Sequence, residues 1–191
     1  MNTLLLRSAA IADEGELLER AVVADSRAIG AIYDQYHGAL CSFARRLLGD
    51  DQTAEDLVHD VFVLLPRLLG RFEPGRSLRS FLLGIAANLA QHHLRSTGRR
   101  SRMAARFARE LAPAVATPEH EVERRRMAEA LRRALDGLPF DQRVAFVLCE
   151  IEGHPTREAA DILGVPDGTL RRRLFDARQK LRARLTKEGV L

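Results

Sequence analysis

The stretch that decides the fold is Thr156-Arg-Glu-Ala-Ala-Asp-Ile-Leu-Gly-Val-Pro-Asp-Gly-Thr-Leu-Arg-Arg-Arg-Leu-Phe175. Its first eight residues predict a short helix, in which the small side chains of Ala159 and Ala160 can pack closely on a neighbour. Gly164 supplies the left-handed backbone that commonly ends a helix, and a second helix opens near residues 168–169. Two short helices joined by such a turn predict a helix-turn-helix, whose second helix enters the major groove of DNA.

The second helix of this motif has one apolar and one polar face. Four apolar residues at helical spacing predict the inward side: Leu170, Leu174, Ala177 and Leu181. The outward side presents four candidate DNA contacts: Thr169, Arg171, Arg172 and Phe175. An arginine can donate two hydrogen bonds to guanine, and a phenylalanine can contact the methyl group of thymine. A basic helix face that is merely solvated is the alternative interpretation.

Helical periodicity also dominates the rest of the chain. Ala, Leu, Arg and Glu are abundant and no strand-like alternation is found, which predicts an all-α fold. A Thr53-x-x-Asp56 capping box predicts where the third helix begins. Pro66 predicts a kink or an early end of that helix, because proline lacks the N–H group that a helix interior needs. We expect helices at about residues 14–24, 25–47, 53–69, 78–95, 119–137, 140–151, 156–163 and 168–186.

A basic segment divides the chain. Residues 96–118 lose the periodicity and contain glycine and proline among arginines, which predicts a flexible basic linker. Six arginines against one glutamate give residues 95–118 a charge of +5, whereas residues 1–94 carry −3 and residues 119–191 carry +2. Such concentrated positive charge suits a polyanion. We therefore expect two small helical domains, residues 14–95 and 119–186, that behave as separate units. No role is assigned to residues 1–13.

Several classes of protein are disfavoured by the sequence. A secretory signal and an apolar segment long enough to cross a bilayer are both missing, so we expect a cytoplasmic protein without membrane contact. Cys41 and Cys149 are far apart and fit small buried side chains in a reducing compartment. No phosphate-binding glycine loop, nucleophile–base pattern or paired-cysteine spacing points to an enzyme or to a cofactor.

Four potential metal ligands lie close together on one predicted helix. Glu55 and His59, and likewise Asp56 and Asp60, lie four residues apart and so share a helix face. A metal site needs several converging ligands, and no second helix carries matching ones. We therefore expect a solvated acidic face and no metal site.

Three segments resemble the extracytoplasmic-function sigma factors of the sigma-70 family. Residues 153–181 resemble region 4, whose helix-turn-helix binds the minus-thirty-five promoter element. The polymerase-binding helix of region 2 is similar to Ala44-Arg-Arg-Leu-Leu-Gly-Asp-Asp-Gln-Thr-Ala-Glu-Asp-Leu-Val-His-Asp-Val-Phe62. The segment that opens the minus-ten element is similar to Arg71-Phe-Glu-Pro-Gly-Arg-Ser-Leu-Arg-Ser-Phe-Leu-Leu-Gly-Ile-Ala-Ala-Asn88. The resemblance implies a transcription initiation factor that binds core RNA polymerase, directs it to promoters and needs no cofactor.

The resemblance also implies roles for individual residues. Four residues would form the outer face that docks on the β′ clamp helices of the polymerase: Asp56, His59, Asp60 and Phe62. Asn88 lies where the family receives a flipped minus-ten base, and its amide offers both a donor and an acceptor. Phe81 would stack on a base, and Arg95 would contact backbone phosphates. The resemblance further implies an anti-sigma factor as a partner.

Other functions stay open on the sequence alone. A helix-turn-helix regulator that acts without polymerase would explain residues 153–186, but it leaves the acidic helix around residues 55–60 without a purpose. A nucleic-acid enzyme would need a catalytic constellation, and none can be named. A third alternative is a protein-interaction module that keeps a sigma-like domain as a decoy.

Overall fold

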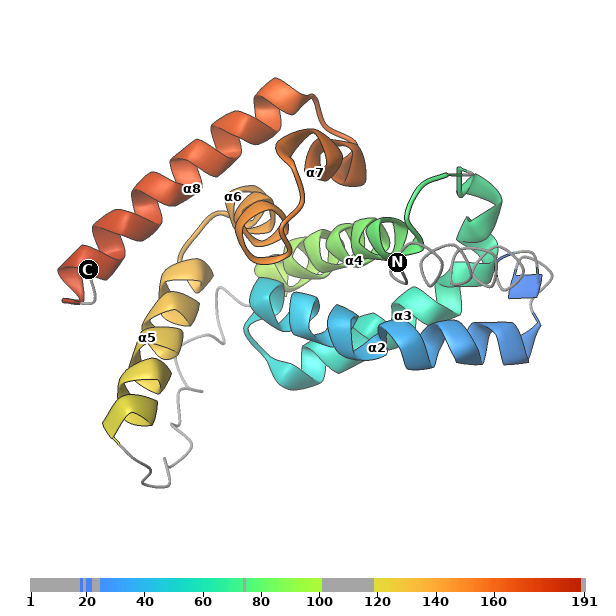
Figure 1. Ribbon diagram of the computed structural model, residues 1–191, viewed down its shortest axis with the longest axis horizontal. Helices are drawn as coiled ribbons and strands as arrows, with labels where there is room; N and C mark the ends of the chain where they lie inside the picture. Colours follow the sequence, from blue (N-terminus) through green and yellow to red (C-terminus); the bar gives the residue numbers. More distant parts are fainter. Residues whose placement is uncertain (1–17, 19, 22–24, 74, 101–118, 190–191) are drawn as a thin grey trace, which may run out of the picture.

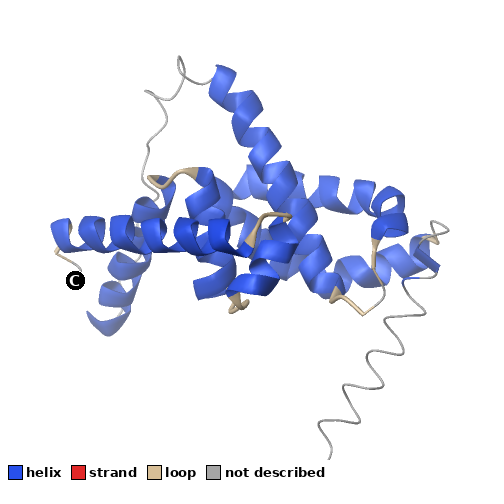
Figure 2. Ribbon diagram, turned by 90° about the horizontal axis from the view of Figure 1, so that it is seen from above, coloured by secondary structure: helices blue, strands red, loops and turns tan. Residues whose placement is uncertain are grey.

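The computed structural model describes residues 18, 20–21, 25–73, 75–100 and 119–189, in which every regular element is helical (Figure 2). The all-α prediction is thereby confirmed. The expected helix at residues 14–24 and the linker from residue 101 onward lie mostly outside the described residues. The elements are α2 (Ser26–Leu48), α3 (Asp51–Leu68), a 3₁₀ turn (Leu69–Arg71), α4 (Leu78–Arg100), α5 (Glu119–Asp136), α6 (Phe140–Phe146), a π-helical segment (Val147–Ile151), α7 (Thr156–Leu163) and α8 (Asp167–Lys187).

None of the described helices combines the length and the apolar character that crossing a membrane requires. Both cysteines are free, Cys41 buried and Cys149 half-buried, in agreement with the expectation of small interior side chains. Burial raises the pKa of both thiols above its ordinary value.

The first domain differs from the sequence prediction at the start of α3, at Pro66 and at the end of α4. The carboxylate of Asp50 accepts a hydrogen bond from the Thr53 N–H (2.7 Å) and caps α3, so this helix begins before the expected capping box. Aspartate is a stronger N-cap than threonine, which explains the difference. The helix also continues through Pro66 to Leu68, because a proline in the last turn removes only one hydrogen bond. At its far end α4 extends to Arg100, beyond the expected residue 95.

The chain forms two groups of helices (Figure 1). Helices α2, α3 and α4 pack on one another and make the first domain, while α5, α6, α7 and α8 make the second. Large apolar side chains of the first domain are fully buried, among them Ile32, Phe43, Leu65 and Leu82. In the second domain α8 packs on α5, α6 and α7. Helices α5 and α6 therefore pack against the second helix of the helix-turn-helix.

In this arrangement the two domains share one apolar core. Buried residues from the second domain belong to the same apolar core as those of α2, α3 and α4: Val144, Ala145, Val147, Leu148, Ala159, Ala160 and Leu170. A smaller second core lies within the second domain alone: Ala134, Leu135, Leu138, Ala177 and Leu181. Periodicity in the sequence identifies which face of α6 or α7 is apolar, but it does not say whether the same domain or another one covers that face.

Two largely buried charged side chains, Glu152 and Arg143, make hydrogen bonds between the two domains. Glu152 follows the π-helical segment and is 7% exposed, and its carboxylate accepts hydrogen bonds from Arg46 of α2 (2.9 Å) and Arg79 of α4 (2.5 Å). Arg143 of α6 is 8% exposed and donates to the carbonyl oxygens of Leu47 and Asp136, each at 2.6 Å. Burial lowers the pKa of the Arg143 guanidinium, yet these carbonyls compensate part of the lost hydration.

A glycine allows α7 to approach α4. A Cβ atom built on Gly84 of α4 would lie 2.9 Å from the carbonyl oxygen of Ile162 in α7, closer than real Cβ atoms come. The obstacle is backbone, so it cannot rotate away as a flexible side chain would. The close contact between α4 and α7 therefore depends on the missing side chain at residue 84.

We predict that Gly84→Ala moves α7 away from α4. Spin labels at the exposed positions Gln52 and Gln179, one in each domain, should report a longer or broader distance distribution by electron paramagnetic resonance. Gly38→Ala is the matched control, because a Cβ atom there meets nothing within 4 Å. An unchanged distribution in Gly84→Ala would contradict the role given to this contact.

Candidate nucleic-acid and protein-binding surfaces

The helix-turn-helix is formed as the sequence predicted. Helix α7 ends at Gly164, which has the left-handed φ of +62°, and α8 begins at Asp167, one residue before the expected start. Ala159 and Ala160 are buried, so α7 packs closely on its neighbours. The four residues predicted to face inward from the second helix are all buried: Leu170, Leu174, Ala177 and Leu181.

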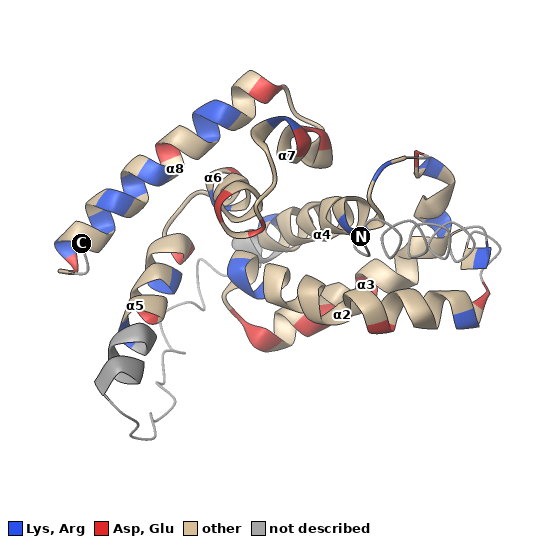
Figure 3. Cartoon of the chain, in the orientation of Figure 1, with Lys and Arg blue, Asp and Glu red and all other residues tan. Residues whose placement is uncertain are grey.

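The outer face of α8 carries the predicted DNA contacts. Thr169, Arg171 and Arg172 are exposed, and the Phe175 ring is 60% exposed, which is unusual for so large an apolar side chain. Lys and Arg recur along the whole helix (Figure 3). Arg171 pairs with Asp167 one turn earlier (2.9 Å). Because exposed ion pairs contribute little, this pair holds Arg171 only weakly in its present place.

A cavity of about 490 Å³ lies between α3, α4 and α7. Phe81 and Asn88, the two residues expected to receive a base, both line it. The Phe81 ring is half-buried and meets the edge of Phe72 with 5.3 Å between ring centroids, while Asn88 is exposed at the surface. The structure therefore brings together an aromatic surface for stacking and an amide for hydrogen bonding.

Two arginines at this cavity were missed by the sequence analysis. Arg71 and Arg76 flank the turn before α4 and line the cavity, and both are exposed. The sequence contains a feature that predicts this proximity: the two arginines lie on either side of a proline–glycine pair, and such a turn brings its two ends together. Arg95, the predicted phosphate contact, is exposed farther along α4 and is not among the residues that line the cavity.

Helix α7 covers part of this cavity. Asp161 and Ile162 contribute to its lining, and the Ser80 hydroxyl of α4 donates to the Glu158 carboxylate of α7 (2.9 Å). Burial alone would raise the pKa of Glu158, but hydrogen bonds from Ser80 and His154 outweigh it and lower the pKa. In this arrangement the helix-turn-helix occupies space next to the base-receiving residues.

The outer face of α3 is acidic, as expected, but one predicted member is misplaced. Asp56, His59 and Asp60 are exposed. Phe62 is only 7% exposed and packs against the Tyr33 ring of α2, so it does not belong to the outer face. Phe62 lies four residues after the buried Val58 and thus on the inward side of the helix. Val63, 59% exposed, supplies the apolar group of the outer face instead.

Both domains match known family models. Residues 32–100 match the model described as Sigma-70 region 2, and residues 128–181 match the model described as Sigma-70, region 4. The first match contains the α3 face and the Phe81–Asn88 cavity residues of α4, and the second contains the helix-turn-helix. The two matches therefore fall on the helices that carry the surfaces described above.

Curated proteins and a solved structure are similar to this chain over most of its length. The chain is 29% identical to the RNA polymerase sigma-H factor of Pseudomonas aeruginosa, over 87% of this chain and 90% of that protein. It is 35% identical to the ECF RNA polymerase sigma factor SigE of Mycolicibacterium smegmatis, over 81% of this chain and 60% of that protein. The sigma factor RpoE of Bartonella quintana, crystallised with the anti-sigma factor NepR, superposes with a TM-score of 0.65 at 27% identity, over 82% of this chain and 96% of that one.

We predict that Phe62→Ala acts on stability and Val63→Ala does not. Removing a buried phenylalanine ring should lower the free energy of unfolding by about 3–5 kcal/mol, whereas truncating an exposed valine should change it by less than about 0.5 kcal/mol. Urea unfolding followed by circular dichroism measures both. Equal effects of the two substitutions would show that the inward and outward faces of α3 are wrongly assigned.

Proposed function

Because the chain belongs to the sigma-70 family, in its extracytoplasmic-function group, we propose that it binds core RNA polymerase and directs it to specific promoters. The observation that carries the proposal is that regions 2 and 4 match in this order, on the helices that bear the exposed surfaces. The protein acts by binding and not by chemistry. Its place of action is the cytoplasm, where polymerase and promoter DNA meet.

Recognition of the minus-thirty-five element is assigned to α8. Arg171 and Arg172 donate to base edges in the major groove, and Thr169 helps to position the start of the helix on the backbone. Phe175 contacts a thymine methyl group, which gives its exposed ring a partner. The support for this assignment is that all four side chains are exposed on a helix whose other face is buried.

Recognition and opening of the minus-ten element are assigned to the cavity beside α4. Asn88 accepts an extruded base and Phe81 provides a surface on which it stacks. Extrusion costs on the order of a few kcal/mol in lost stacking, and contacts that only the extruded base can make offset that cost. Arg71, Arg76 and Arg95 hold the phosphates on either side. The support for this assignment is that Phe81, Asn88 and the two arginines come from α4 and the segment before it, so they stay together when α7 moves away.

Docking on the β′ clamp helices is assigned to the outer face of α3. Asp56, His59 and Asp60 form its polar part, and Val63 takes the apolar place first given to Phe62. An acidic surface suits a basic protein partner and repels DNA phosphates. The exposure of all four residues supports this assignment.

Simultaneous contact with both promoter elements requires the domains to separate. The elements are about 25 base pairs apart, which is roughly 85 Å along B-DNA at 3.4 Å per base pair. The packed arrangement holds α4 against α7, so the two reading surfaces cannot span that length. We therefore propose that the packed arrangement belongs to the chain before it meets polymerase, and that the two domains separate afterwards.

An anti-sigma factor is the proposed inhibitory partner. The similarity to the structure of RpoE with NepR extends over 82% of this chain and so includes residues of both domains. A partner that binds the packed arrangement more tightly lowers the population of the separated, promoter-binding arrangement. It need not contact the DNA-binding residues of α4 or α8 to do so.

We predict that Asp60→Lys weakens binding to core polymerase at least about tenfold, which corresponds to about 1.4 kcal/mol. The substitution reverses a charge on the docking face, and Glu129→Lys on α5 makes the same charge change far from that face. Fluorescence anisotropy with labelled protein measures core binding, and run-off transcription measures activity.

A helix-turn-helix regulator would bind promoter duplex equally well with and without polymerase and would support no transcription. Normal core binding by Asp60→Lys would refute the docking assignment.

We predict that Asn88→Ala impairs promoter opening and spares duplex binding. Holoenzyme with this variant should bind a minus-thirty-five duplex almost normally, because α8 is unchanged. Transcription should fall on a closed promoter and fall much less on a template with a premelted bubble. Permanganate footprinting of unpaired thymines reports opening directly. Unchanged permanganate reactivity at a promoter limited by melting would remove Asn88 from the mechanism.

A further inference from the structure

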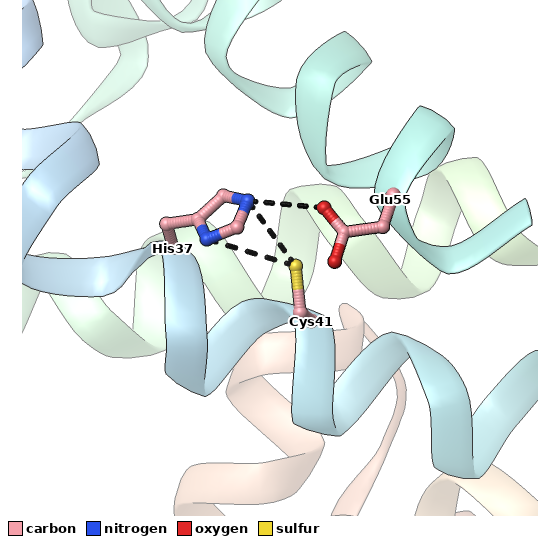
Figure 4. A group of neighbouring side chains, drawn as sticks. All are labelled: His37, Cys41 and Glu55. Atoms are coloured by element: carbon pink, nitrogen blue, oxygen red, sulfur yellow. Dashed lines mark hydrogen bonds and ion pairs between the residues drawn. The ribbon is translucent and has the colours of Figure 1, made fainter. Parts of the chain in front are cut away.

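Three potential metal ligands meet on the side of the first domain where α2 packs on α3 (Figure 4). His37 and Cys41 lie four residues apart on α2 and therefore project from one face of that helix. Glu55 reaches the same point from α3. One ligand atom of each residue lies within 4.8 Å of the others. None of the three has a role in the promoter or polymerase surfaces proposed above.

Two of the three distances between the ligand atoms are close to those of a tetrahedral zinc site, and the third, between the Cys41 sulfur and the Glu55 carboxylate, is within 4.8 Å. The Nε2 atom of His37 lies 3.4 Å from the Cys41 Sγ atom and 3.3 Å from the Glu55 Oε2 atom. Tetrahedral Zn²⁺ with ordinary bond lengths places N and S about 3.6 Å apart and N and O about 3.3 Å apart. The imidazole therefore already lies at a suitable distance from both other ligands, and the sulfur and the carboxylate need to approach each other by at most about 1 Å to bind the ion.

Neighbouring side chains contact two of the three ligands, His37 and Glu55. The Tyr33 ring lies beside the His37 ring, with 4.6 Å between centroids. Arg45 lies 3.8 Å from the Oε1 atom of Glu55 and leaves the Oε2 atom turned to His37. Such outer contacts orient the ligands of protein metal sites. Cys41 is buried in the core, whereas the side chains of His37 and Glu55 are 29% and 47% exposed, so an ion enters from solvent.

We propose that His37, Cys41 and Glu55 form a Zn²⁺ site that fastens α2 to α3. One sulfur, one nitrogen and one oxygen ligand occupy three of the four tetrahedral positions, and water or an external ligand takes the fourth. A thiolate with an imidazole favours zinc over the oxygen-preferring ions Mg²⁺ and Ca²⁺. The zinc site does not rest on the proposed function, although Glu55 shares a helix face with His59 of the docking surface.

Cobalt titration of the full, untagged chain tests the site. Co²⁺ replaces Zn²⁺ in tetrahedral sites, and a thiolate ligand gives it a near-ultraviolet charge-transfer band. We expect about one equivalent to bind with this band and to be displaced by Zn²⁺. Cys41→Ser should abolish the band, while Cys149→Ser, which alters the other cysteine, should leave it intact. The absence of the band in the wild-type chain, or its loss in Cys149→Ser alone, would overturn the proposal.

Glu55→Gln covers the case in which the buried Cys41 variant fails to fold. This substitution is isosteric and lies on a half-exposed side chain, and it should weaken zinc binding about tenfold or more. Zinc should raise the melting temperature of the wild-type chain and should raise that of Glu55→Gln much less at the same concentration. X-ray absorption of the zinc complex should show sulfur at about 2.3 Å and nitrogen or oxygen at about 2.0–2.1 Å. Equal affinity in Glu55→Gln, or a spectrum without sulfur, would refute the three-ligand site.

Discussion

The ion pairs of Glu152 fix how the helix-turn-helix domain sits on the first domain. Its carboxylate is almost fully withdrawn from water and lies between a guanidinium from α2 and another from α4. A carboxylate buried without such partners would cost several kcal/mol, so arrangements of the domains that leave it unpaired are disfavoured. The apolar core between the domains is less directional, because alanine, valine and leucine side chains pack in many registers. Glu152 therefore selects one register among those that burial of apolar area alone would permit.

This register places α7 over the part of α4 that carries the candidate base-receiving residues. The close approach at Gly84 and the Ser80–Glu158 hydrogen bond both follow from it. A glycine inside a helix costs about 1 kcal/mol relative to alanine, and here it permits the contact between the two helices. The same α4 surface thus serves the packed arrangement and lines the cavity assigned to the minus-ten base, and these two uses exclude each other.

The sequence was sufficient for those features that depend on one helix at a time. Inward residues of α8 follow from helical spacing, and Gly164 marks the turn before it. The inward position of Phe62 also follows from helical spacing, because Phe62 lies one turn after the buried Val58. The shared core and the His37–Cys41–Glu55 cluster were beyond reach, since each depends on which residues of two packed helices face one another. A periodic pattern identifies the apolar side of a helix and leaves its partner and register undetermined.

The composition of the junction explains how one chain can have both a packed and an extended arrangement. Arg46 and Arg79 stay partly exposed, at 37% and 39%, although the carboxylate between them is buried. A phosphate group presents paired oxygens to a guanidinium much as a carboxylate does, so a polyanion competes with Glu152 for these arginines. When the two domains separate, the Glu152 carboxylate is hydrated again. This hydration offsets part of the free-energy cost of losing its two ion pairs. An all-apolar junction would lack this exchange, because exposing its surface to water brings no compensating partner. Because the junction contains these charged groups, a nearby polyanion favours separation of the two domains.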